Sequence, residues 1–315
     1  MFLQPEPART EELAPAFRLL FSHLPHDECD KRLSNALLLL ERGELIADGV
    51  FVLRGPKGIR GSILCLPIVG ATALVWPPHC VADESTSSNE DRLVRRATDW
   101  LKAQGVKVAQ ALLSVEENGL GASLQRNGFR HVTHLCFYRH DLEPAGLRPD
   151  RPLQLEYRTY EECDAEVFQQ TLGRTYLESQ DFPEMNGVRT VAEVILGHQS
   201  QGRYDPSRWF LALVEDRPVG VLLLTELAES GDWDLSYVGV VPEARRHGFG
   251  SDLVRKALIE AHYADAMYLS LAVDGRNLPA LEMYRRLGFE PYDRREVYLA
   301  VWPTPLVQAS SEYKP

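Results

Sequence analysis

Residues 238–251 read VGVVPEARRHGFGS, and this stretch decides the fold. An apolar run ends at Pro242, a turn with the pattern Arg-x-x-Gly-x-Gly spans Arg245 to Gly250, and an amphipathic helix is expected from Gly250 to Tyr263. Exposed N–H groups at a helix N-terminus bind phosphate, and the helix dipole adds about half a positive charge there. Gly248 and Gly250 let a phosphate approach the backbone without meeting a Cβ atom. The stretch predicts a strand, a diphosphate-binding turn and a helix.

Two other phosphate motifs are excluded by spacing. The turn lacks the third glycine of a dinucleotide-binding fingerprint, and no Gly-Lys-Ser/Thr follows it as in a P-loop. An ordinary strand–turn–helix with capping glycines is the alternative. Downstream, residues 277–289 read NLPALEMYRRLGF, which predicts a helix that carries Asn277, Ala280 or Leu281, and Tyr284 on one face.

The chain contains an internal repeat. Leu93-Val94-Arg95-Arg96-Ala97 matches Leu253-Val254-Arg255-Lys256-Ala257 at an offset of 160, and Gly128-Phe129 matches Gly288-Phe289 at the same offset. A run rich in proline, glycine and charge, Glu143 to Pro152, has the composition of a linker between the two copies. We therefore predict two domains, residues 1–145 and 146–315.

Hydrophobic periodicity gives a similar element order in both halves. The second half predicts the order β-α-α-β-β-β-α-β-α-β, with the hairpin 209–224, a strand over 233–241 and a final strand over 295–302. The first half follows a similar order over helices 11–22 and 29–41 and strands 49–54, 61–66 and 72–76, but it is expected to lack the opening strand. Residues 55–61, rich in glycine, are expected to form a hairpin loop.

The two motifs together resemble the GNAT superfamily of acyl-CoA-dependent N-acyltransferases. The resemblance is strong over residues 153–303 and weak, but in register, over residues 1–142. The tandem arrangement is similar to the mycothiol synthase group. The resemblance implies an α/β protein of two tandem GNAT-like domains, each a mixed, mostly antiparallel twisted sheet flanked by helices. It also implies an acetyl-CoA-dependent N-acetyltransferase in which a primary amine of a small molecule or peptide attacks the thioester directly, in a ternary complex.

The resemblance also assigns cofactor-binding residues. The backbone around Val238 and Val240 is expected to pair with the pantetheine arm, and Asn277 to contact it, although Asn277 could equally be an ordinary helix N-cap. The remaining candidates belong to the turn and surround the diphosphate of acetyl-CoA: Arg245, Arg246, His247, Gly248, Gly250 and Ser251.

Two residues are candidates for proton transfer. Tyr284 occupies the position of the family's tyrosine, and a phenol with a pKa near 10 can protonate the leaving thiolate. Asp234, 11 positions before Arg245, is the candidate base, with Glu226 and a base-free route through water as alternatives. Tyr176, Glu178, Asp181 and Glu184 suggest a cationic acceptor, although an acidic loop can simply be solvated.

The first copy lacks each of these features. At the offset of 160, Gly250 corresponds to Glu90, Gly248 to Ser88, Arg245 to Ser85 and Asp234 to Leu74, and Tyr284 aligns with Leu124. A carboxylate in place of a glycine repels phosphate. We expect the first half to retain the fold without the cofactor chemistry, so that acetyl-CoA binds once per chain. A non-catalytic acyl-CoA-binding sensor or scaffold is the alternative to an enzyme.

Composition limits the other classes. A length of 315 residues favours two domains over one, and a net charge of −11 argues against a general nucleic-acid binder. The five cysteines include no Cys-x-x-Cys pair, so no metal site is expected and a reducing cytosol fits them. No signal peptide begins the chain, and the apolar stretch 63–76 is too short to span a bilayer. We expect a cytoplasmic monomer or homodimer that binds neither membrane nor nucleic acid.

Overall fold

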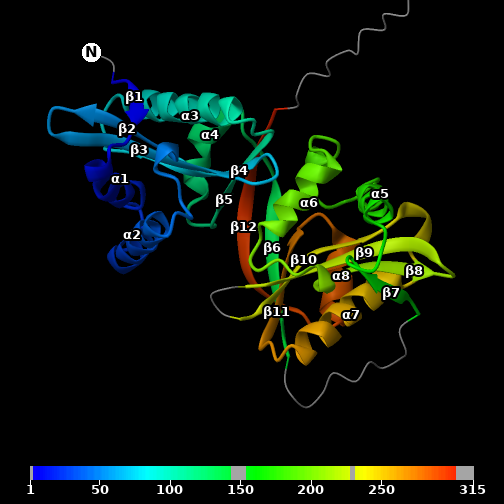
Figure 1. The fold of residues 1–315 in the computed structure, drawn as a ribbon. Helices are drawn as coiled ribbons and strands as arrows, with labels where there is room; N and C mark the ends of the chain where they lie inside the picture. The colour runs from blue at the N-terminus through cyan, green and yellow to red at the C-terminus, as the bar shows by residue number, and fades with distance from the viewer. Residues whose placement is uncertain (1–2, 143–153, 228–230, 303–315) are drawn as a thin grey trace, which may run out of the picture.

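The computed structural model describes residues 3–142, 154–227 and 231–302, so the predicted linker lies outside the described residues. Both halves have the same order of elements (Figure 1). The first half contains β1 (Pro5–Pro7), α1 (Leu13–Leu20), α2 (His26–Glu41), β2 (Val50–Gly55), β3 (Gly58–Ile68), β4 (Thr72–Cys80), α3 (Thr86–Ala103), β5 (Val108–Leu113), α4 (Gly121–Arg126) and β6 (Arg130–Asp141). The second contains β7 (Glu156–Thr159), α5 (Ala165–Thr175), α6 (Val191–Gln199), β8 (Trp209–Val214), β9 (Arg217–Glu226), β10 (Trp233–Val240), α7 (Phe249–Tyr263), β11 (Tyr268–Asp274), α8 (Leu278–Arg286) and β12 (Glu290–Val301). None of the described helices is long and apolar enough to cross a membrane.

The first half does have an opening strand, which corrects the expectation from sequence. β1 pairs antiparallel with β2, with Pro5 opposite Leu53. It is only three residues long and contains two prolines. Such a strand is tolerated at the edge of a sheet, where a missing N–H breaks no ladder, but it leaves no alternating pattern in the sequence.

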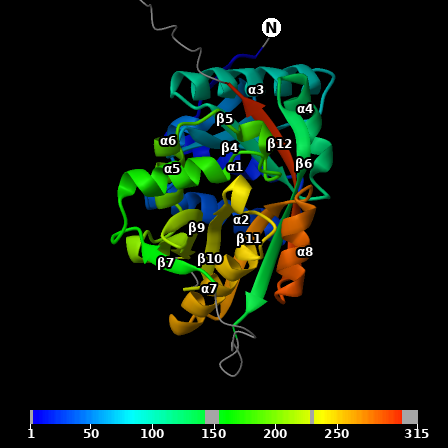
Figure 2. The same cartoon turned by 90° about the vertical axis from the view of Figure 1, so that its right-hand side faces the viewer.

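The described strands form a single twelve-stranded sheet in the order β1-β2-β3-β4-β5-β12-β6-β11-β10-β9-β8-β7. The two halves exchange their last strands: β6 pairs with β11 of the second half, and β12 pairs with β5 of the first. β6 and β12 also pair with each other at the centre, where they run between the two halves (Figures 1 and 2). If each strand of the first half is exchanged for its counterpart in the second half, the strand order reads the same from the opposite end of the sheet. This symmetry is expected of a duplicated fold.

The cores follow the exchanged strands. Tyr138 of β6 packs in the core of the second half, on the face covered by α7, and Tyr298 of β12 packs in the core of the first half with α3. Each tyrosine is at most 4% exposed. Each half therefore buries apolar surface that the other half supplies. The free energy of unfolding of each half thus depends on the strand that it receives from the other.

Each half contains one short parallel pairing within its otherwise antiparallel part of the sheet. β4 and β5 pair only over Thr72–Leu74, and β10 and β11 pair only at Trp233 and Asp234. Beyond these residues the strands of each pair diverge. The gap opens a cavity in each half, and the two cavities have different linings.

Candidate active site

The cavity of the second half lies where β10 and β11 diverge. β10 contains a β-bulge between Leu235 and Tyr237, immediately after the stretch that pairs with β11. The cavity has a volume of about 780 Å³. Val238 and Val240, whose backbone is predicted to pair with the pantetheine arm, line it. Beyond Asp234, β10 has no pairing with β11, so this edge can pair with an extended ligand.

The turn after β10 has the local geometry that the sequence indicates. Gly248 is the N-cap of α7 at φ +86°, and Arg246 also has a positive φ of +64°. The positive φ at 248 therefore favours glycine there. Arg246, Gly248, Gly250 and Ser251 line the cavity beside the N-terminus of α7. His247 does not line it: its exposed ring stacks on Phe249, with ring centroids 5.7 Å apart.

Arg245 lines the same cavity, but its guanidinium is engaged by backbone carbonyls. Nε donates to Val240 O at 3.0 Å, and the Nη groups donate to Thr175 O at 3.0 Å, Leu177 O at 2.6 Å and Glu178 O at 3.1 Å. Three of these carbonyls follow the end of α5, where helical carbonyls lack partners. The sequence motif predicts Arg245 as part of the diphosphate site. Its contacts make it the residue that ties the C-terminus of α5 to the phosphate turn.

This arrangement makes Arg245→Lys a destabilising change. A lysine keeps the charge but cannot reach four carbonyls from one planar fork, so the free energy of unfolding should fall by about 1–3 kcal/mol. Chemical denaturation measures the change, and Arg246→Lys at the neighbouring exposed position is the matched control. Equal stability of the two variants would contradict the role assigned to Arg245.

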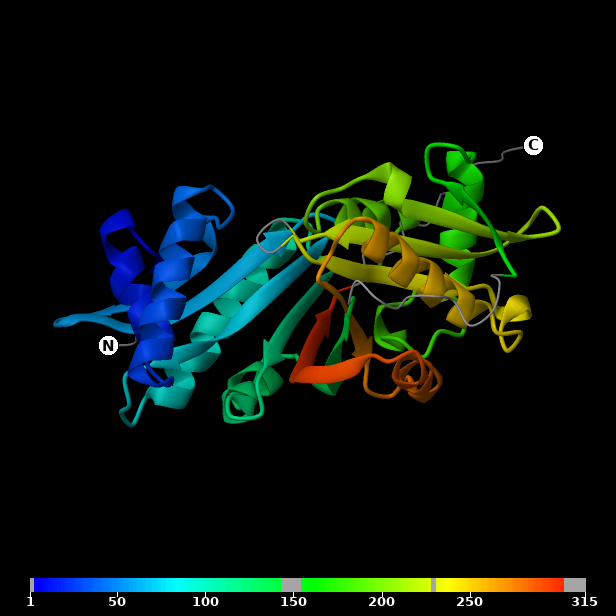
Figure 3. The ribbon, with the colours of Figure 1, turned by 90° about the horizontal axis from the view of Figure 1, so that it is seen from below.

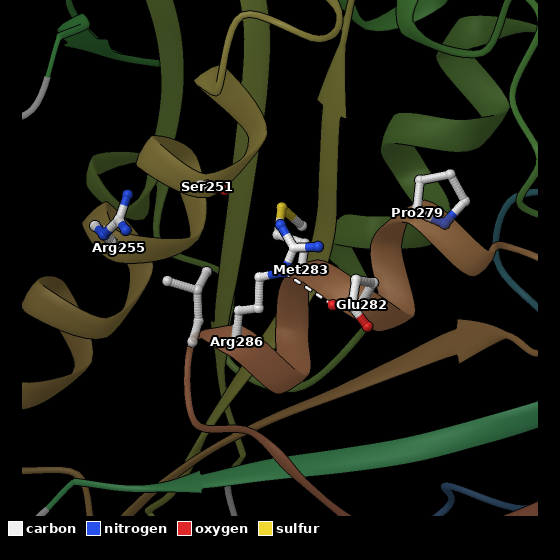
Figure 4. Close-up of a pocket in the computed structure, with 7 residues that line it drawn as sticks. Ser251, Arg255, Pro279, Glu282, Met283 and Arg286 are labelled. Carbon is white, nitrogen blue, oxygen red and sulfur yellow. Dashed lines mark hydrogen bonds and ion pairs between the residues drawn. The ribbon is translucent and has the colours of Figure 1, made fainter.

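A groove of about 600 Å³ continues from the cavity between α7 and α8 (Figure 4). The two share Ser251, Pro279 and Met283. Arg255 of α7 and Arg286 of α8 lie on opposite sides of the groove, and Arg286 also bonds Glu282 at 2.9 Å. The structure places Arg286 at a groove that has guanidinium groups on both sides.

Asn277 and Tyr284 meet at the other wall of the cavity. Asn277 is the N-cap of α8, with its Oδ1 accepting from Ala280 N at 3.3 Å, and it also lines the cavity, so the two readings of this residue hold together. Tyr284 is 6% exposed and packs on Phe289, but it too lines the cavity. Burial raises the pKa of Tyr284 above its usual range, and the charge of Asp181 adds to the effect. The phenol is therefore protonated at neutral pH.

Asp234 lies behind the cavity wall. Its Oδ1 accepts from Ser270 Oγ at 3.1 Å and its Oδ2 from Ser236 Oγ at 3.3 Å, and Ser236 lines the cavity. Burial raises the pKa of Asp234, and the two serine hydrogen bonds only partly oppose the shift. Glu226 is not on the wall and instead faces Arg203 at 3.5 Å. Of the two sequence candidates for the base, only Asp234 has a hydrogen-bonded link to the cavity.

Of the four residues after α5 that suggest a cationic acceptor, two line the cavity and two do not. Glu178 and Asp181 line the cavity, whereas Glu184 bonds Arg276 and Tyr176 packs against Tyr237. Asp181 Oδ1 accepts from Asp274 N at 2.9 Å, which holds the loop against the end of β11. Burial raises the pKa of Asp181. Asp181 therefore lies near Tyr284, whereas the backbone of Glu178 contacts Arg245.

Residues 175–289 match the Acetyltransferase (GNAT) family. The C-terminal half contains a GNAT domain. The match begins in α5 and ends just after α8, so it includes every wall of the cavity described above. The expected classification and fold class are confirmed.

Relatives of this chain include mycothiol acetyltransferases. That of Thermobifida fusca is 28% identical over 168 residues, 50% of each chain, and that of Beutenbergia cavernae is 26% identical over 208 residues, 59% of this chain and 68% of the relative. The chain thus matches about half the length of the Thermobifida protein. A GCN5-related N-acetyltransferase from Sphaerobacter thermophilus has a similar fold, with a TM-score of 0.63 at 18% identity over 94% of this chain and 95% of that one. A tandem GNAT protein from the clavulanic acid biosynthesis pathway has a TM-score of 0.51 at 16% identity, covering 95% and 98%.

The first half has no counterpart of the GNAT phosphate turn. α3 begins at Thr86, so Ser88 and Glu90 lie inside the helix, whereas α7 begins only at Phe249, the equivalent of Asn89. Glu90 bonds Arg126 at 3.3 Å, and Leu124 is fully buried in the core. The extended helix occupies the chain positions that form the open turn in the GNAT domain.

Proposed function

We propose that the protein is an acetyl-CoA-dependent N-acetyltransferase whose single active site lies in the GNAT domain. The observation that carries the proposal is the continuous cavity and groove from Tyr284, past the unpaired edge of β10, to the N-terminus of α7 and on between Arg255 and Arg286. An elongated ligand with a thioester, an amide-containing arm, a diphosphate and a nucleotide would meet these surfaces in the order in which they follow one another along the cavity and groove. Helix N–H groups suit the diphosphate, and the two arginines suit a further phosphate.

The chain's own residues supply the proton transfers. The nitrogen of a neutral amine attacks the thioester carbonyl carbon, the C–S bond breaks, and Tyr284 gives its proton to the departing thiolate. The nitrogen loses a second proton as the amide forms, and this proton replaces the one that Tyr284 gave to the thiolate. The first proton, which the cationic amine loses before the attack, passes to the Ser236 hydroxyl as that hydroxyl gives its own to Asp234. Glu178 and Asp181 bind the acceptor's positive charge before it loses this proton. The acceptor is therefore a primary amine that enters as a cation.

The direct test measures release of free thiol from acetyl-CoA in the presence of a panel of primary amines, including amino sugars, diamines and peptides. We expect amine-dependent release with at least one cationic acceptor. Tight binding of acetyl-CoA without release for any amine would support the non-catalytic sensor instead.

Gly248→Leu should raise the dissociation constant for acetyl-CoA by more than about tenfold, because a side chain at this position occupies the space through which the diphosphate approaches the backbone. Gly105→Leu is the matched control: Gly105 also has a positive φ of +78°, and a Cβ there meets nothing within 4 Å. Both variants carry similar backbone strain, so calorimetry with acetyl-CoA separates strain from ligand contact.

The parent protein should bind one acetyl-CoA per chain in the same calorimetric experiment. Two equal sites per chain would refute the single-site assignment.

Asp234→Asn should lower turnover roughly a hundredfold and change the pH profile. The base must be ionised, so activity falls as the pH drops through its pKa, and burial places that fall above the usual range of an aspartate. The asparagine cannot take the proton, so this acidic limb should disappear. Asp181→Asn, in comparison, should raise the KM for a cationic amine and retain the acidic limb of the pH–activity profile. If Asp181→Asn removes the limb and Asp234→Asn does not, Asp181 is the base.

A further inference from the structure

The first half contains a second cavity, of about 490 Å³, beneath α2 at the point where β4 and β5 diverge. This volume lies in the range of small-molecule sites, roughly 300–1,000 Å³. α1 packs on β3 and β4, and α2 packs on α1, on the outer side of the first half (Figure 3). The cavity shares no lining residue with the GNAT site. Its inner side comes from the central strands, through Phe137 of β6 and Arg295 of β12.

Most of the cavity wall is apolar. Leu74 and Trp76 of β4 line it, and in the repeat they stand where the GNAT domain has Asp234 and Ser236. The polar pair that we assign to proton transfer is thus replaced by two large apolar side chains that face a cavity. A ligand here must present mainly apolar surface.

One face of α2 completes the wall. Arg32, Asn35, Ala36 and Leu39 follow helical spacing and all line the cavity. Leu38, next to Leu39, does not line it and is 42% exposed. The helix therefore offers adjacent leucines, one inside the cavity and one outside.

The polar end of the cavity is built around Glu117, whose side chain is 7% exposed. Its Oε1 accepts from Arg32 Nη1 at 2.9 Å and faces His23 Nε2 at 3.2 Å, and its Oε2 accepts from Ser114 N at 3.1 Å. Arg295 Nη1 lies 3.9 Å from Oε2. Burial raises the pKa of Glu117, but its hydrogen bonds and the charge of Arg32 outweigh burial and lower this pKa to about 2. The carboxylate is therefore ionised, with both oxygens engaged.

Asp293 is a second carboxylate in the lining, and its oxygens accept from Arg294 N at 2.7 Å and Arg295 Nε at 2.8 Å. With both carboxylates hydrogen-bonded, the guanidinium groups supply the remaining donors at this end. Arg32 uses Nε for Glu28 and Nη1 for Glu117, and Arg295 uses Nε for Asp293. Neither Nη2 makes a hydrogen bond within the described residues. The remaining N–H donors of these two guanidinium groups, at the end of an apolar cavity, match a carboxylate head, which accepts charge-assisted hydrogen bonds.

We propose that this cavity is a second ligand site, independent of acetyl transfer, for a monocarboxylate with an apolar chain or ring. The apolar body lies between α2 and the diverging strands, and the carboxylate lies against Arg32 and Arg295. Because Arg295 belongs to β12, the last strand of the GNAT half, the site contains residues from both halves.

The test uses dodecanoate, below its aggregation concentration, with the full-length chain. Calorimetry should show saturable binding to one site, and Trp76 in the wall should change its fluorescence. Dodecanol should bind at least roughly tenfold more weakly, since it lacks the charged head. Leu39→Trp fills the cavity and should abolish binding, whereas Leu38→Trp, on the outer face, should leave it unchanged.

Arg32→Gln and Arg295→Gln should each weaken dodecanoate binding by roughly tenfold or more and bring it towards that of dodecanol. Acetyl-CoA binding by the same variants reports that they are folded and is expected to be unchanged. Absence of saturable dodecanoate binding, equal binding of dodecanol, or full binding in Leu39→Trp would each overturn the proposal. None of these results bears on the acetyltransferase proposal, which depends on the other cavity.

Discussion

Tyr284→Phe should lower turnover by about 10²–10⁴-fold and change acetyl-CoA affinity little. The substitution removes only the hydroxyl that we assign to protonation of the thiolate. The ring still packs on Phe289 in the core of the second half. Because burial raises the pKa of the phenol, Tyr284 should stay protonated through the neutral range and produce no basic limb there. Steady-state kinetics and calorimetry on the same preparation measure both quantities.

Tyr298→Phe is the matched control for this variant. Tyr298 occupies a comparable buried position in the first half and donates to Asn118 Oδ1 at 2.6 Å, far from the cavity of the GNAT domain. Its loss should cost stability but not turnover. Unchanged turnover in Tyr284→Phe would end the assignment of the acid.

Residues 146–315 expressed alone should be insoluble or inactive. In the whole chain β12 lies between β5 and β6, both from the first half, and β6 also covers the edge of β11. Removing them leaves unpaired edges on two strands and exposes the apolar surface that Tyr138 and its neighbours cover. Expression yield, size-exclusion chromatography and the thiol-release assay measure the outcome.

Co-expression with residues 1–145 as a separate chain is the control. The exchanged strands should reassemble the sheet and restore solubility, because their pairing does not need a covalent connection. A soluble 146–315 fragment with full activity would show that the first half is not needed to complete the GNAT fold, and the domain limits predicted from sequence would then describe independent units.

The sequence could predict those parts of the site that depend on neighbouring residues. The turn at Gly248, the N-cap at Asn277 and the shared face of Asn277 and Tyr284 follow from local spacing, because helix termini and helix faces are set within a few residues. The role of Arg245 could not be predicted in this way. Its partners are carbonyls about 70 positions away, and an arginine in a phosphate motif looks the same whether it binds a ligand or the backbone.

The sequence by itself indicated the duplication, the resemblance to the GNAT family and the half in which we place the active site. The matched pentapeptides, the two Gly-Phe pairs and the loss of turn, acid and base in the first copy are all readable from aligned positions. Only the tertiary structure decided that the halves exchange β6 and β12, and that the first half encloses an apolar cavity ending in Arg32 and Arg295. Strand partners and cavity walls are non-local. They depend on which distant segments meet in the folded sheet, and hydrophobic alternation in a strand is the same whichever half provides its neighbour.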